Sequence, residues 1–115
     1  MGLKVNTRKV ANVVIIDIKG DIALGKHSGE LRDTVRDLLL DGHKRILLNM
    51  EEVGYVDSSG LAELVSSMTS AGSRGGALKL LRLQKKVREA LRLTRLDSVF
   101  QIFNDESDAL RSFEG

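Results

Sequence analysis

Gly54-Tyr55-Val56-Asp57-Ser58-Ser59-Gly60-Leu61 joins the two most strongly patterned stretches of this chain. Before it, the apolar run at residues 45–50 is typical of a short buried strand. After it, apolar residues recur at the i, i+3, i+4 and i+7 spacing of an amphipathic helix, namely Leu61, Leu64, Val65 and Met68. The two serines are therefore predicted to lie where the chain leaves a sheet and enters a helix.

A helix start of this kind favours negative charge, because its first N–H groups lack partners and the positive end of the helix dipole lies there. Helix capping by Asp57, Ser58 or Ser59 explains any one of these polar residues, at about 1 kcal/mol. Capping does not require three of them in succession. The functional interpretation is a phosphorylation switch, since a phosphoserine adds about −1.5 to −2 charges. A partner that binds the bare hydroxyl would then meet a dianion beside Asp57.

Size and composition are those of one soluble domain spanning residues 1–115. The absence of cysteine excludes disulfides, thiolate metal sites and cysteine nucleophiles. No apolar run approaches the roughly 20 residues of a membrane span, and the N-terminus lacks a signal pattern. We therefore expect a cytoplasmic protein with no membrane contact.

The rest of the pattern predicts an α/β fold with a mixed β-sheet of four to five strands, an N-terminal hairpin and about four helices. Residues 3–8 and 13–18 have the alternation and β-branching of two strands. Further strands are expected at residues 45–50, 77–83 and 99–103, with a helix after each and another before the first of them.

Serine and glycine residues mark the expected starts and ends of these helices. Ser28 is a candidate N-cap of the first helix, and Gly42 is its expected stop. The second helix is expected to begin near Ser59, to reach about Ala71 and to be closed by Gly72.

Enzymatic chemistry is not indicated, and we expect no catalytic residues, no metal and no cofactor. A serine nucleophile needs a base within reach, and only His27 and His43 are available, on other elements. The glycine-rich stretch at residues 72–76 precedes a strand, whereas phosphate-cradling loops open a helix. The charged residues between Arg74 and Arg95 are all basic except Glu89, but the segment contains no aromatic side chain for base stacking, so we expect no nucleic acid either.

A family resemblance adds to this interpretation. Val-Asp-Ser-Ser-Gly-Leu at residues 56–61, after Ile-Leu-Leu-Asn-Met-Glu-Glu-Val at residues 46–53, resembles the signature of STAS domains, and more narrowly that of bacterial anti-sigma factor antagonists. The resemblance implies that Ser58 is the phosphate acceptor, with Asp57, Ser59 and Gly60 as its neighbours. It also implies a partner-binding surface formed by Asp21, Leu24, Ser58, Ser59 and Leu61.

The same resemblance implies the partners. The unphosphorylated protein would bind an anti-sigma factor that is a serine/threonine kinase of the GHKL type and thereby free sigma factor, and a PP2C-type phosphatase would reset the switch. At Ala23 the chain departs from the family, which often carries an acid near this position. Two alternatives stay open: a STAS protein that regulates a non-sigma output, and a nucleotide-binding STAS domain. Weak homodimerisation is left open as well.

Overall fold

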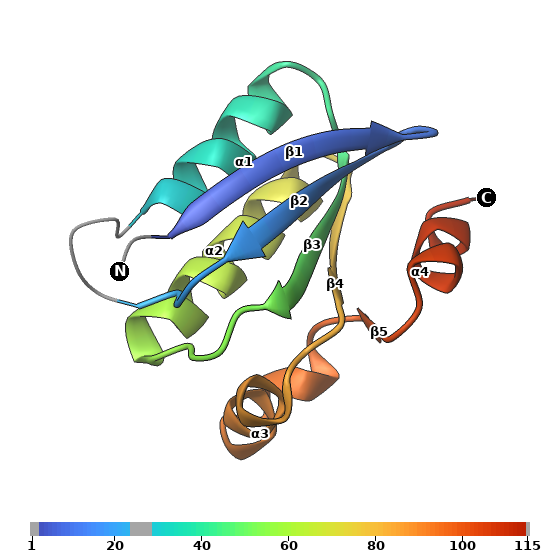
Figure 1. Ribbon diagram of the computed structural model, residues 1–115. Helices are drawn as coiled ribbons and strands as arrows, with labels where there is room; N and C mark the ends of the chain where they lie inside the picture. The colour runs from blue at the N-terminus through green and yellow to red at the C-terminus, as the bar shows by residue number, and fades with distance from the viewer. Residues whose placement is uncertain (1–2, 24–28, 115) are drawn as a thin grey trace.

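The computed structural model describes residues 3–23 and 29–114. In this part of the chain the elements follow the predicted order, with one short 3₁₀ helix added (Figure 1). The strands are β1 (Lys4–Val10), β2 (Val13–Lys19), β3 (Arg45–Glu52), β4 (Ala77–Leu81) and β5 (Ile102–Phe103). The helices are α1 (Glu30–Leu40), α2 (Ser58–Ser73), α3 (Lys85–Leu93), η1 (Leu96–Ser98) and α4 (Glu106–Ser112).

Within the described residues, the strands form one five-stranded mixed sheet whose spatial order, β1-β2-β3-β4-β5, is the order of the chain. β1 and β2 form an antiparallel hairpin, and β2, β3, β4 and β5 run parallel. The parallel pairs need crossover helices, and α1, α2 and α3 supply them. The predicted α/β class, mixed sheet and N-terminal hairpin are confirmed.

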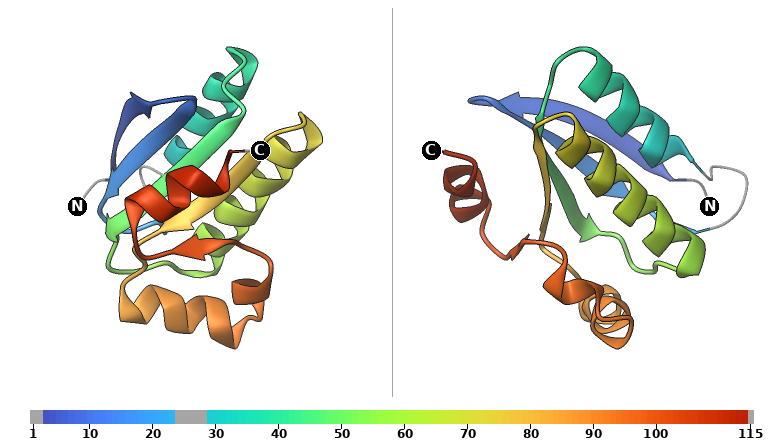
Figure 2. Two further views of the ribbon diagram at one scale, coloured as in Figure 1. Left: turned by 90° about the vertical axis from the view of Figure 1, so that its right-hand side faces the viewer. Right: turned by 180° about the vertical axis from the view of Figure 1, so that it is seen from behind.

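Alternating side chains place a core on each face of the sheet. Ile16, Ile46 and Leu48 point to the face covered by α1 and α2, a core to which α3 adds Val87 and Leu91. The opposite face carries a smaller core that α4 covers through Ala109, together with Val13, Ile15, Leu47 and Leu81. Figure 2 shows α1 and α2 on one side of the sheet and α4 on the other. Because both faces are covered, the central strands read as continuous apolar runs.

The helix ends correct two expectations. The N-cap of α1 is Gly29, in the left-handed region, and not Ser28, which lies outside the described residues. Gly29 has no side chain to cap the helix, and its own N–H donates to Glu63 Oε1 of α2 at 3.0 Å. Gly72 does not end α2, which runs on to Ser73. The stop is Gly75, whose φ of +79° favours glycine.

The last strand is shorter than predicted. Residues 96–100 turn instead of extending, because Val99 N and Phe100 N both donate to Leu96 O. Only Ile102 and Phe103 remain to pair with β4. β4 likewise ends at Leu81 and not at residue 83.

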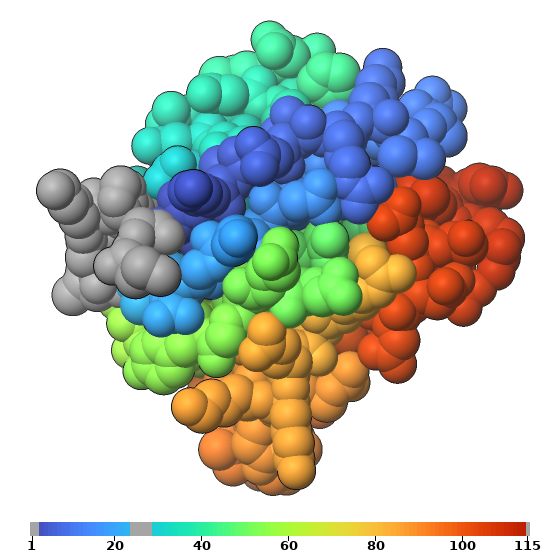
Figure 3. Space-filling view, in the orientation of Figure 1, coloured from blue at the N-terminus to red at the C-terminus, as the bar shows by residue number. Residues whose placement is uncertain are grey.

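A charged network attaches α4 to the hairpin. Arg8 donates to Asp17 Oδ2 at 2.6 Å and to Glu106 Oε1 at 2.9 Å, and Asn49 Nδ2 donates to Asp17 Oδ1 at 2.8 Å. In Figure 3 the hairpin and α4 meet on the face turned toward the viewer. Hydrogen bonds from Arg8 lower the pKa of Asp17 and that of Glu106.

Candidate functional site

The serines lie at the strand-to-helix junction that the sequence predicted. Asp57 is the N-cap of α2 and Ser58 is its first residue. The Asp57 carboxylate accepts from Gly60 N at 2.8 Å, and the Asp57 carbonyl accepts from Leu61 N at 2.8 Å. Capping, which the sequence left open among three residues, thus belongs to Asp57.

Both hydroxyl-bearing residues of this turn are exposed. Within the described residues, neither Ser58 nor Ser59 forms a side-chain hydrogen bond, since Asp57 caps the helix. The Ser58 hydroxyl stands in the first turn of a 16-residue helix, where unpaired N–H groups and the helix dipole favour a negative group. The local geometry can therefore accept a phosphate at this position without loss of an internal contact.

The segment that follows β2 is attached to this turn. Ile22 N donates to Tyr55 O at 3.0 Å, and Asp57 N donates to Ile22 O at 3.3 Å. Ile22 and Val56 form an isolated parallel bridge. Residues 21–23 are consequently placed beside the start of α2, although they lie far from it in the sequence.

The other predicted contact residues have different surroundings. Asp21 is exposed, and its carboxylate lies close to Gly54. Leu61 is only 8% exposed and belongs mainly to the core. Leu24 lies outside the described residues. Ala23, where the family often has an acid, is half-buried.

An apolar groove of about 470 Å³ runs beside Ser58. It is formed by Ser58, Leu61, Ala62, Val65, Ser66, Thr94 and Leu96. The sequence analysis did not identify Ala62, Thr94 or Leu96 as site residues. The i, i+4 relation of Ser58 to Ala62 could have indicated the first, but Thr94 and Leu96 reach the groove only through the tertiary fold.

Among the residues that the structure describes, no catalytic or metal-binding groups are gathered at this turn. His43 follows α1 and lines a cavity next to Gly75, beyond the far end of α2, so it does not pair with Ser58. His27 lies outside the described residues. In residues 3–23 and 29–114, no group of three potential metal-ligating side chains is close enough to hold an ion. The same residues contain no helix that is long and apolar enough to cross a membrane.

The family can be assigned from comparison with known proteins. The STAS domain model matches residues 4–109, which is nearly the whole chain. The chain belongs to the STAS domain family. A protein of Thermotoga neapolitana, provisionally named an anti-sigma factor antagonist homologue, is 32% identical over 79 residues, or 69% of this chain and 70% of that protein.

Solved structures of STAS proteins show the same fold. A Thermotoga maritima crystal structure, provisionally named an anti-sigma factor antagonist, has a TM-score of 0.89 at 27% identity and covers 96% of this chain and 95% of its own. The phosphorylated form of the Bacillus cell fate determinant SpoIIAA has a TM-score of 0.72 at 20% identity, covering 95% and 98%. Its unphosphorylated form has also been solved, at a TM-score of 0.70. The resemblance found in the sequence is thereby confirmed for the family.

Proposed function

We propose that this STAS domain is a phosphorylation-switched antagonist of an anti-sigma factor. The unphosphorylated protein binds an anti-sigma factor that is also a serine kinase of the GHKL type, and sigma factor is released. Phosphorylation of Ser58 ends the interaction, and a PP2C-type phosphatase restores it. The observation that carries the proposal is the exposed Ser58 hydroxyl in the first turn of α2, beside an apolar groove and next to a capping carboxylate.

The physical effect of the phosphate would be local. Its oxygens would face the free N–H groups of the α2 start, so the domain itself would tolerate them. A partner surface seated in the groove would meet about two added charges next to the Asp57 carboxylate. Desolvating those charges is costly, so binding would be lost while the fold is kept.

Two observations on similar proteins support the proposal. The relative with 32% identity bears the name of an anti-sigma factor antagonist. SpoIIAA, which shares the fold, exists in phosphorylated and unphosphorylated forms.

The test is binding of the purified chain to each anti-sigma factor kinase of its host, measured by calorimetry with and without ATP. Ser58→Ala should bind as the unphosphorylated protein does and should take up no phosphate. Ser58→Asp should bind at least tenfold more weakly, although one carboxylate imitates a phosphate incompletely. Ser59→Ala should still be phosphorylated on Ser58. Ser70→Ala is the matched control, since it removes an exposed hydroxyl near the other end of α2 and should leave both properties unchanged.

Mass mapping of the phosphorylated chain locates the acceptor. Phosphate on Ser59, or on no residue of this turn, would refute the assignment of Ser58. Binding to a protein unrelated to sigma factors, with the same dependence on Ser58, would favour the alternative in which the switch controls another output. The half-buried Ala23 next to Ile22 is the observation that keeps this alternative, because relatives often carry an acid near this position.

A further inference from the structure

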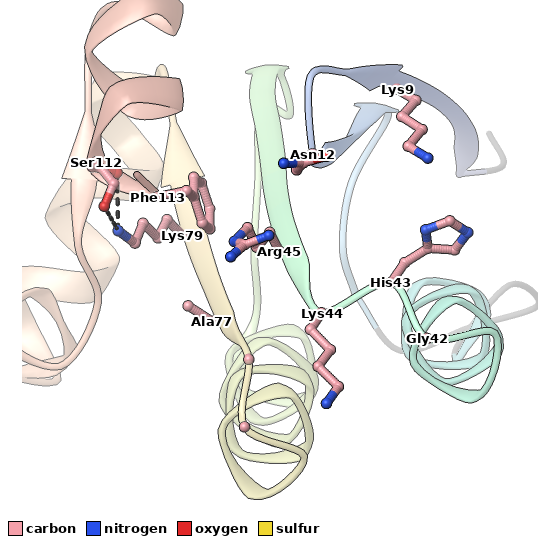
Figure 4. A pocket seen from close by; sticks show the side chains of 12 residues that line it. Lys9, Asn12, Gly42, His43, Lys44, Arg45, Ala77, Lys79, Ser112 and Phe113 are labelled. Carbon is pink, nitrogen blue, oxygen red and sulfur yellow. Dashed lines mark hydrogen bonds between the residues drawn. The ribbon is translucent and has the colours of Figure 1, made fainter. Parts of the chain in front are cut away.

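A second cavity, of about 460 Å³, opens at the end of the sheet remote from Ser58. It is bounded by the starts of β3 and β4, the turn of the β1–β2 hairpin and the end of α4 (Figure 4). It includes Gly75, just past the C-terminus of α2, whereas Ser58 begins that helix. A helix of 16 residues is about 24 Å long, so the cavity and the phosphorylation turn are separate sites.

The charged side chains that line the cavity are all positive. They belong to Lys9, Lys44, Arg45 and Lys79. Among the described residues, none that lines it is acidic. A concave surface with charges of one sign focuses its field and raises the local concentration of ions of the opposite sign.

Lys79 is the most informative of these residues. It is 7% exposed, and its Nζ donates to the Ser112 carbonyl and to Ser112 Oγ, both at 2.9 Å. Nζ also lies 4.4 Å from the centre of the Phe113 ring. Within the described part of the chain, no carboxylate pairs with this ammonium. Lys79 therefore contributes positive charge to the wall of the cavity, while its hydrogen bonds hold the end of α4.

Arg45 lies on the same face of the sheet, at the start of the neighbouring strand. It pairs with Ala77 in the sheet register, two residues before Lys79. In the view of Figure 4 the Phe113 ring lies between the two basic side chains. Arg8 and Arg82 each have carboxylate partners, but among the residues that the structure describes Arg45 has none.

Part of this basic character has a structural explanation. Lys44 lies four residues beyond the last residue of α1, and positive charge near a helix C-terminus is favourable. Lys79 holds the last turn of α4 through the Ser112 carbonyl. Arg45, on the other hand, has an exposed guanidinium without a carboxylate partner among the described residues, so it is the group of the cavity that is open to a ligand.

We propose that this cavity binds a small ligand with two or more linked phosphoryl groups. Guanidinium and ammonium groups are the side chains that bind phosphate oxygens most strongly, and several of them lie around one opening. The volume is within the range of small-ligand sites, about 300–1,000 Å³, and exceeds what one phosphate requires. An inorganic polyphosphate and the phosphate tail of a nucleotide share this chemistry. The site is independent of the Ser58 switch.

The test is a titration of the full chain, followed by amide NMR, with sodium tripolyphosphate, ATP and sodium sulfate at matched ionic strength. Tripolyphosphate should give saturable shifts at the backbone of Gly75, Gly76 and Lys79 and none at Ser58. Arg45→Gln should weaken binding about tenfold or more, the order expected for one charge-assisted hydrogen bond. Lys86→Gln, on the exposed face of α3, is the matched control and should leave affinity unchanged.

A gain of affinity is expected from one further variant. Glu114 lines an adjoining hollow that shares Arg45 and Phe113, so Glu114→Gln should strengthen binding. Tighter binding of ATP than of tripolyphosphate would identify a nucleotide as the source of the phosphates, and equal binding would identify the phosphate chain alone. Shifts that do not saturate, equal losses in Arg45→Gln and Lys86→Gln, or sulfate binding as tight as that of tripolyphosphate would overturn the proposal.

Discussion

Gly60 packs directly against the carbonyl of Ile22, so that a Cβ atom on Gly60 would lie 1.9 Å from the Ile22 oxygen. No side chain can be accommodated at that distance. The glycine after the two serines is therefore required by packing, because it lets the segment after β2 touch the first turn of α2. The contact fixes residues 21–23 and Ser58 as one surface.

Gly60→Ala should destabilise the domain by about 1–3 kcal/mol or displace the segment around Ile22, since the overlap is with backbone. Gly72→Ala is the matched control in the same helix, where an added Cβ meets nothing within 4 Å. There the loss of glycine flexibility should stabilise the fold by about 0.4–1 kcal/mol. Urea denaturation of both variants measures the difference, and equal effects would refute the packing argument.

Leu64→Ala should cost about 2–5 kcal/mol, because Leu64 is fully buried between α2 and the sheet. Leu93→Ala removes the same atoms from a side chain that is 70% exposed and should change stability by less than about 0.5 kcal/mol. Thermal unfolding of the two variants checks this prediction. An unchanged midpoint for Leu64→Ala would show that the faces of α2 are wrongly assigned.

Asp57→Ala should cost about 1 kcal/mol, since it removes the acceptor for Gly60 N at the start of α2. Ser59→Ala should be nearly neutral, because Ser59 does not cap the helix. Chemical denaturation separates the two variants. A larger loss for Ser59→Ala than for Asp57→Ala would contradict the observed cap.

Acid should weaken the attachment of α4 to the hairpin. The pKa values of Asp17 and Glu106 are lowered in the folded state by Arg8, so the unfolded chain binds more protons as the pH falls. The stabilisation is present at neutral pH and is lost progressively below about pH 5. Arg8→Met should flatten this dependence, which can be measured as the free energy of unfolding between about pH 7 and pH 2.

Arg36→Met is the control for the acid experiment. Arg36 lies 3.4 Å from Asp33 on the open surface of α1, where ion pairs contribute little. Its pH dependence should match that of the unchanged protein. If Arg8→Met also matches the unchanged protein, the network does not carry the acid sensitivity.

Local signals were sufficient for most of the fold. The apolar run around Leu47 and the helical stripe through Leu64 predicted β3, α2 and the turn between them, because both patterns have a clear period. The N-cap of α1 was wrongly assigned to Ser28: the cap is Gly29, in the left-handed region, and the contact of its N–H with Glu63 on another helix cannot be predicted from local sequence. No pattern in the sequence predicted a helix at residues 96–98, yet they form a 3₁₀ helix, and β5 is shorter than expected.

The candidate site was also predicted only in part. Ser58 and Asp57 were identified because a strand-to-helix junction is visible in the sequence. The groove was not identified, because Thr94, at the end of α3, lies beside Ala62 only in the folded domain. The basic cavity was missed for a related reason: Arg45 and Lys79 lie far apart in the chain and become neighbours through sheet pairing.

The agreement between strand order and chain order has a consequence for synthesis on the ribosome. Each new strand adds to the free edge of the one before it, so no strand has to insert between two others as the chain emerges. The second apolar face, with Ile15, Leu47 and Leu81, stays bare until α4 is released. A nascent chain that lacks residues 106–112 therefore exposes this apolar face to chaperones. Folding of α4 onto the sheet then covers it.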